Sequence, residues 1–170
     1  VQGERRNVMG ESGLKVMRIR SREPLWLPET GLRDFFAQAF AEEHMPDGDD
    51  AWAWCGALIE NPNVALFVAR DDEMKWVGLA VCDWADTVWS PTPVVLALHS
   101  TGRDVLRSLL AEIRDWGLSL EQEDIRFVNA TKHSDAAYAR LVSDFAEAKP
   151  VGGLMEAKWR TEDVIRSGLE

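Results

Sequence analysis

One stretch of the sequence combines the features that a phosphate-binding site needs. Residues 94–98 are apolar (Val-Val-Leu-Ala-Leu), residues 99–102 read His-Ser-Thr-Gly, and an amphipathic pattern begins at Arg103. The pattern predicts a buried strand that passes through a glycine-containing turn into the N-terminus of a helix. The first amides of a helix have no partner within it, and the helix dipole adds partial positive charge there. The chemistry that we expect at this turn is the binding of an anion such as a phosphate.

Charged side chains near this turn are candidates for proton transfer. His99 directly follows the apolar strand, and Asp83 and Asp86 precede it in the chain. His99 is the best candidate for a general base, because an unperturbed imidazole titrates near neutral pH. The alternative, a histidine that only bonds to the backbone of the turn, stays open. His44 lies in an expected loop, and we assign it no role.

The turn and its place in the chain resemble the acyl-CoA loop of the GNAT acetyltransferase superfamily. On that family's Q/R-x-x-G-x-G/A motif, His99 takes the Q/R position, Gly102 the first Gly and Asp104 the last position. Bare glycines let backbone amides approach a pyrophosphate closely. Asp104 instead puts a carboxylate there, which we expect to cost ~1–3 kcal/mol in a partly desolvated site. The adjacent Arg103 could offset this by contacting phosphate, and an acid in the first helical turn also stabilises the helix.

A second signature of the family is N-x-x-A, then a Tyr four residues on, then G-F. Ala136 and Phe145 match it, whereas His133, Arg140 and Asp144 replace the Asn, the Tyr and the Gly. The resemblance implies that a Tyr at this position protonates the departing CoA thiolate. Arg140 cannot readily donate a proton, although it can supply positive charge. Both signatures therefore differ from the family at positions that matter for the chemistry.

Three residues with reactive side chains are expected to be structural. Tyr138 lies two residues from Arg140, about 200° around a helix, so it points elsewhere and is expected in the core. Cys55 and Cys82 lie in apolar segments, without His or Cys at the spacing of a metal site. We expect buried thiols and no metal.

Two functions follow from these residues. The sequence favours a non-catalytic or weakly catalytic binding and assembly module with the GNAT fold, similar to GNAT-like virion or internal proteins of phages. It would need no cofactor, and its partners would be protein subunits of a larger assembly. Asp104, Arg140, eight tryptophans and a polar N-terminal arm support this interpretation.

The alternative is a divergent acetyl-CoA-dependent N-acetyltransferase that acts on a primary amine. His99 would be its base, and Arg140 would stand at the family's Tyr position. The resemblance implies that acetyl-CoA is then held by the strand and the turn, through Val95, Leu96, Leu98, Gly102, Arg103 and Asp104. An open cleft beside the strand would indicate the enzyme, and a cleft filled by side chains or by a partner would indicate the assembly protein.

Hydrophobic periodicity predicts the order β-α-α-β-β-β-α-β-α-β, a mixed α/β fold in which helices flank a central sheet. The last helix is expected over residues 134–145 and the last strand over residues 149–159, with an interruption at the two glycines 152–153. We expect a flexible arm over residues 1–14, one GNAT-like domain over residues 15–160 and a polar tail over residues 161–170.

Composition disfavours several classes of protein. A net charge of −10 and a pI near 4.8 disfavour nucleic-acid binding, because such a surface repels phosphate backbones. No apolar run approaches the ~20 residues of a membrane-spanning helix. The polar N-terminus does not resemble a signal peptide. We therefore expect no membrane association and a cytoplasmic or virion protein that is not secreted.

Overall fold

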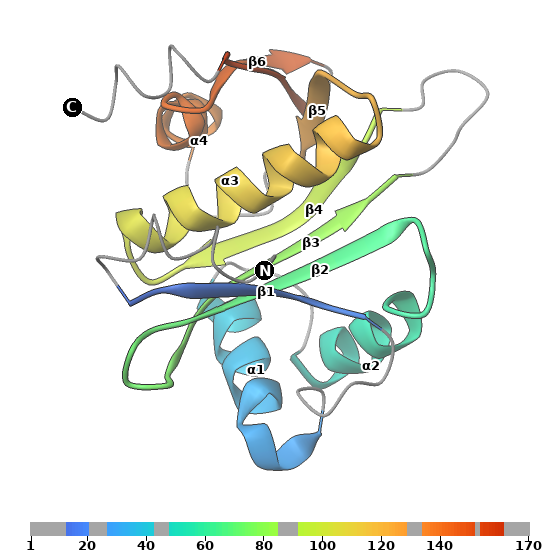
Figure 1. The fold of residues 1–170 in the computed structure, drawn as a ribbon, viewed down its shortest axis with the longest axis vertical. Coiled ribbons are helices and arrows are strands. Elements are labelled where there is room, and N and C mark those ends of the chain that lie inside the picture. Colours follow the sequence, from blue (N-terminus) through green and yellow to red (C-terminus); the bar gives the residue numbers. More distant parts are fainter. Residues whose placement is uncertain are drawn as a thin grey trace, which may run out of the picture.

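A seven-stranded sheet organises the molecule (Figure 1). The computed structural model describes residues 13–20, 27–42, 48–84, 92–128, 134–151 and 154–161. The strands are β1 (Lys15–Ile19), β2 (Val64–Arg70), β3 (Trp76–Asp83), β4 (Val94–Ser100), β5 (Asp124–Phe127), β6 (Ala146–Val151) and β7 (Leu154–Trp159). They lie in the order β1-β2-β3-β4-β5-β7-β6, and every neighbouring pair is antiparallel except β4 and β5.

Helices cover both faces of this sheet. The helices α1 (Leu32–Glu42), preceded by the 3-10 turn η3 (Pro28–Thr30), and α2 (Gly48–Leu58) lie against one face, and α3 (Arg103–Ser119) and α4 (Asp135–Val142) lie against the other (Figure 1). Each face has its own apolar core. Phe36, Phe40 and Cys55 belong to the first, and Leu109, Ile113 and Phe127 to the second. Because strands such as β2 are covered on both sides, their sequences are continuously apolar and not alternating.

The close approach of α3 to the sheet depends on a glycine in β3. A Cβ atom built on Gly78 would lie 2.6 Å from Val105 Cγ1 and 2.9 Å from Leu109 Cδ1. Residue 78 therefore has to be small for the first turns of α3 to pack where they do. This contact fixes the start of α3 relative to the end of β4.

The mixed α/β fold predicted from the sequence is confirmed, and three boundaries differ. The last strand is two strands, β6 and β7, which pair antiparallel with Val151 opposite Leu154. The hairpin gives β7 a second hydrogen-bonding partner besides β5, so the backbone of β7 is paired on both edges. The helix α4 ends at Val142, three residues early, and β4 continues through His99 to Ser100. The expected arm and tail lie outside the described residues, apart from residues 13–14 and 161.

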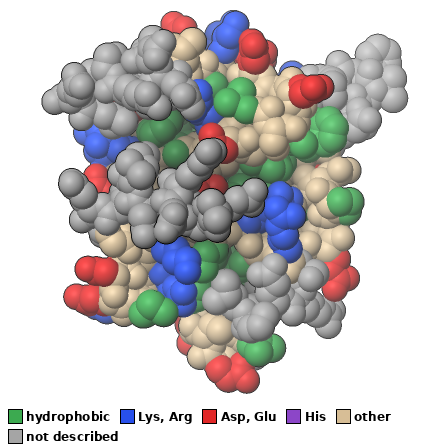
Figure 2. Space-filling model, viewed as in Figure 1, with side chains coloured by type: hydrophobic (Ala, Val, Ile, Leu, Met, Phe, Trp, Pro, Cys, Tyr) green, Lys and Arg blue, Asp and Glu red, His purple; other side chains and the backbone are tan. Residues whose placement is uncertain are grey.

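The described residues on the face shown in Figure 2 form no large patch of one charge. On the face shown in Figure 2, the described basic side chains form small separate groups with acidic ones between them. Within the described ranges, no helix is long and apolar enough to cross a membrane, and no three His, Cys, Asp or Glu side chains are grouped as metal ligands would be.

Candidate functional site

The sheet opens between β4 and β5. These parallel strands pair only through Val94 with Arg126 and Val95 with Phe127, after which β4 continues to Ser100. The last ladder bond among the described residues runs from Val128 N to Val95 O, at 2.9 Å. Beyond it, β3 is the only strand of the described residues that pairs with β4. Within those residues, the second half of β4 thus presents a free backbone edge.

A bulge in β4 marks the point of separation. Val95 pairs with Cys82 and Ala97 with Val81, so Leu96 is an extra residue with no opposite number in β3. A bulge bends a strand, increases its twist and reverses which edge the following backbone groups face. Thr101 N donates to Val77 O at 2.9 Å, so residues 101 and 99 face β3. By alternation, the N–H and C=O groups of Leu98 and Ser100 face the open edge.

A cleft of about 500 Å³ lies along this edge. One wall comes from β4, the following turn and the start of α3: Leu98, Ser100, Thr101, Gly102, Arg103 and Leu106. The other wall comes from α4: Ala137, Tyr138, Arg140, Leu141 and Val142. The walls are mostly apolar, and arginines supply the charge. This size and composition suit a small-molecule site with an anionic group.

The N-terminus of α3 opens into the cleft at Gly102. Gly102 is the N-cap residue, its backbone is extended (φ −166°, ψ 169°), and no side chain caps the helix. A Cβ built on Gly102 would meet nothing within 4 Å, so no described atom crowds the N-cap position. Uncapped amides at a helix N-terminus that face open space form an anion-binding geometry.

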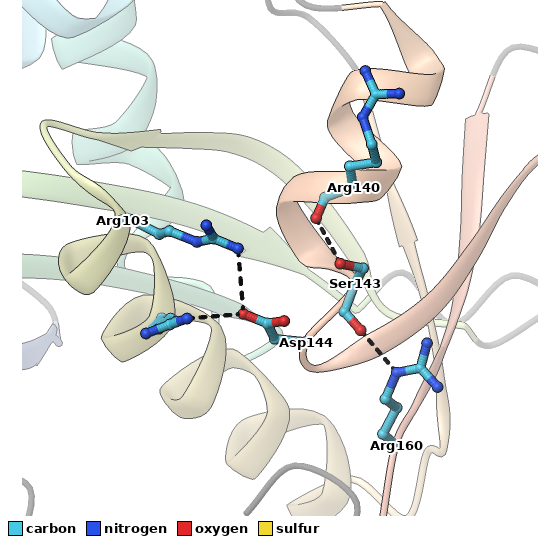
Figure 3. Close-up of polar contacts among 6 residues, drawn as sticks. Arg103, Arg140, Ser143, Asp144 and Arg160 are labelled. Carbon is cyan, nitrogen blue, oxygen red and sulfur yellow. Dashed lines mark hydrogen bonds and ion pairs between the residues drawn. The ribbon is translucent and has the colours of Figure 1, made fainter. Parts of the chain in front are cut away.

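Arginines and one carboxylate surround this end of the cleft (Figure 3). Asp144 Oδ2 lies 3.2 Å from Arg107 Nη2 and 3.8 Å from Arg103 Nη2. The carboxylate thus holds both guanidiniums at the start of α3. The turn that carries Asp144 is itself tied to the end of β7, because Arg160 Nε donates to Ser143 O at 2.8 Å. Figure 3 shows that the Arg140 side chain points away from this cluster.

His99 lies on the opposite face of β4, towards α1. Its side chain is buried, with 7% of its surface exposed, and its Nε2 lies 3.8 Å from Glu42 Oε2 at the end of α1. The ring of Phe35 lies at 5.9 Å from the imidazole, centroid to centroid. The strand β4 therefore separates the cleft from the His99–Glu42 pair.

The structure brings together only part of the predicted acyl-CoA set. Leu98, Gly102 and Arg103 line the cleft, as does Arg140 from α4. Val95, Leu96 and Asp104 do not line it. Val95 is fully buried beneath α3, Leu96 is the bulge residue packed towards α1, and Asp104 is exposed.

Sequence reasoning missed three members of this region. Arg107 follows Arg103 by one helical turn, a spacing that could have signalled a shared basic face. No sequence spacing of this kind indicates that Glu42 lies beside His99, or that Asp144 lies beside Arg107. Each meets its partner only through packing between elements distant in the sequence.

The burial expected of Tyr138, Cys55 and Cys82 is confirmed, but Tyr138 lines the same cleft as Arg140, whereas the sequence predicted that it points elsewhere. Tyr138 is 3% exposed and packs edge-on against Phe127, at 5.8 Å between ring centroids. Cys55 and Cys82 are free and buried. Burial raises the pKa of the Cys55 thiol to about 12 and raises that of Cys82 still further, because a thiolate would be desolvated there.

Comparison with known proteins supplies the fold's relatives. No protein-family model and no curated protein matches the sequence. Among solved structures, this chain is similar to YncA from Salmonella typhimurium, which is assigned as an acetyltransferase and was solved with its cofactor acetyl-CoA. The TM-score is 0.59 and the sequence identity 13%, and the match covers 88% of this chain and 96% of YncA. The spermidine/spermine N-acetyltransferase SpeG from Vibrio cholerae, in mutant forms, gives a TM-score of 0.56 at 11% sequence identity. The match covers 93% of this chain and 99% of SpeG.

An aminoglycoside acetyltransferase from an uncultured soil metagenomic sample gives a TM-score of 0.54 at 14% identity, over 75% of this chain and 87% of that one. The protein therefore has the GNAT fold, as its sequence order and turn predicted. At these identities the likeness establishes the fold and not the activity.

Proposed function

We propose that this protein is an acyl-CoA-dependent N-acyltransferase that transfers an acetyl group to a primary amine. The observation that carries the proposal is the open cleft beside β4, with the uncapped amides of α3 at one end. The sequence alone favoured a non-catalytic module, for which this cleft would be filled. Within the described residues it is open, which supports the enzyme.

The donor would bind along the cleft in a direction fixed by its charge. The phosphates of acetyl-CoA lie against the first amides of α3 at Gly102, where Arg103 adds positive charge. The pantetheine arm runs along the free edge of β4, whose groups at Leu98 and Ser100 accept and donate as a neighbouring strand would. Leu106 and Val142 supply apolar contact.

The chemistry would be direct attack of the amine on the thioester. The amine nitrogen bonds to the carbonyl carbon, and the negative charge that develops on the carbonyl oxygen is stabilised by a backbone N–H of the open edge of β4. The C–S bond then breaks and releases CoA. Because the edge amides are held by the bulge and by β3, they need no reorganisation during the reaction.

His99 is the proposed base for the amine. An acceptor that approaches from the α1 side would meet the imidazole, and its amine would reach the thioester where β4 and β5 stop pairing, with the donor on the other face. The Glu42 carboxylate lies 3.8 Å from Nε2 and places negative charge beside the imidazole. The two named acetyltransferases among the neighbours act on spermidine or spermine and on an aminoglycoside, and both are amine acceptors.

The first test is calorimetric titration with acetyl-CoA, followed by thiol-release assays with a panel of amines. Micromolar binding and amine-dependent release of CoA are expected. A His99→Gln variant should lower kcat/KM by roughly 10²–10⁴ and leave acetyl-CoA affinity unchanged. The absence of heat at millimolar acetyl-CoA would refute the proposal.

A second candidate is the assembly module, favoured by Asp104 and Arg140 at two motif positions. The exposed position of Asp104, away from the cleft lining, weakens the first of these arguments. The two candidates differ in acyl-CoA binding, so the same titration separates them. The similarity to phage virion proteins and the partner subunits stay predictions.

A further inference from the structure

Arg140 is the charged side chain of the α4 wall of the cleft. It is exposed, and no ion pair joins its guanidinium to another described residue. Asp144, the carboxylate nearest in sequence, is held by Arg103 and Arg107. Arg140 is thus a fixed positive charge at the cleft that its own helix does not neutralise.

The donor geometry separates Arg140 from the phosphates. The phosphates lie at the α3 N-terminus, beside the Arg103–Asp144 pair, and the Arg140 side chain points away from that pair (Figure 3). The α4 wall faces the free edge of β4 along the part of the cleft that the pantetheine arm and its sulfur would fill.

We propose that Arg140 is a catalytic residue that stabilises the CoA thiolate as it leaves, in place of a group that protonates it. This inference rests on the proposed acyltransfer. When the C–S bond breaks, its electron pair stays on sulfur, and the sulfur departs as a thiolate beside the guanidinium. The proton of the attacking amine passes to His99 and then to water. The products are the amide, the CoA thiolate and a hydrated proton.

The chemistry of thiols permits this route. An ordinary thiol has a pKa near 8.5, so a thiolate is an acceptable leaving group near neutral pH. A neighbouring arginine lowers that pKa further. The only other titratable side chains lining the described cleft are Tyr138 and Arg103. Tyr138 is buried edge-on against Phe127, and Arg103 serves the phosphate end.

The test compares two ligands, CoA and desulfo-CoA, which lacks only the thiol. Calorimetric affinities are measured between about pH 6.5 and about pH 9.5, a range that spans the thiol pKa. CoA should gain about tenfold in affinity over desulfo-CoA as pH rises, since each unit of pKa shift is tenfold in affinity. Absorbance of the bound thiolate should titrate at lower pH than that of free CoA.

Three variants locate the effect. Arg140→Met should abolish the preference for CoA at high pH and leave desulfo-CoA affinity unchanged, while Arg140→Lys should keep part of it. Arg33→Met is the control for the loss of one positive charge. Arg33 is an exposed residue of α1, which lies against the other face of the sheet (Figure 1), so this substitution should change the affinity for neither ligand. Thermal unfolding of each variant checks the fold.

Two results would overturn the inference. Equal affinity for both ligands at every pH would show that no cation meets the sulfur. Equal weakening of both ligands by Arg140→Met would place Arg140 on the phosphates. Failure of wild-type protein to bind either ligand is a different result, because it overturns the proposed acyl-CoA site together with this inference.

Discussion

Substituting Gly102 with alanine tests whether the α3 N-terminus binds phosphate. The added methyl group meets no protein atom within 4 Å, and the extended backbone suits any residue. Alanine is a poorer N-cap than glycine, which costs about 0.5–1 kcal/mol of folding free energy. Alanine also restricts the unfolded chain more than glycine does, which stabilises the folded protein by about 0.4–1 kcal/mol. The free energy of unfolding should therefore change by less than about 0.5 kcal/mol.

Ligand binding should respond very differently. The methyl group occupies the space through which a phosphate approaches the first amides of α3. Loss of one hydrogen bond to a charged group costs about 1.5–3 kcal/mol, a weakening of roughly 10- to 150-fold in acetyl-CoA affinity. Calorimetric titration measures this, and urea unfolding measures the stability. Wild-type affinity in a fully folded Gly102→Ala variant would refute the phosphate site at this turn.

Three further predictions concern the elements around the cleft. Gly78→Ala puts a Cβ 2.6 Å from Val105 Cγ1 and should lower the free energy of unfolding by about 1–3 kcal/mol in urea denaturation; wild-type stability would show that α3 does not pack as described. Burial raises the pKa of Cys55 from an ordinary 9.0 to about 12, so the thiol ionises at lower pH in the unfolded chain than in the folded protein. The stability that the buried neutral thiol contributes is therefore complete below pH 9.0 and falls as pH rises towards 12. Cys55→Ala should flatten that alkaline decline in unfolding titrations, and an unchanged decline would contradict the burial of this thiol. Asp104→Asn should strengthen acetyl-CoA binding by about two- to fivefold at low salt, with less effect at high salt, while helix stability drops by a few tenths of a kcal/mol; weaker binding would mean that the carboxylate assists the ligand.

Local patterns in the sequence were sufficient for most elements of the fold. The strand expected over residues 94–98 lies within β4, because a continuous apolar run followed by a glycine-containing turn leaves little choice. The helix α3 was equally clear, since its apolar residues recur on one face. The turn at Gly102 that we propose as a phosphate site also follows from local sequence, because helix termini expose amides wherever they occur.

The tertiary structure decided what those elements do together. Pairing between β3 and β4 extended the strand to Ser100 and left Leu96 as a bulge, which opened the edge beside the cleft. The same strand put His99 on the far face, beside Glu42. Strand register and packing between distant segments set these relations. A pattern of period two or 3.6 indicates which face of an element is buried, but it does not say which residues of distant segments meet. The sequence by itself therefore determined the order of strands and helices and the glycine turn before α3, while only the packed structure decided that the cleft is open among the described residues and which side chains meet across it.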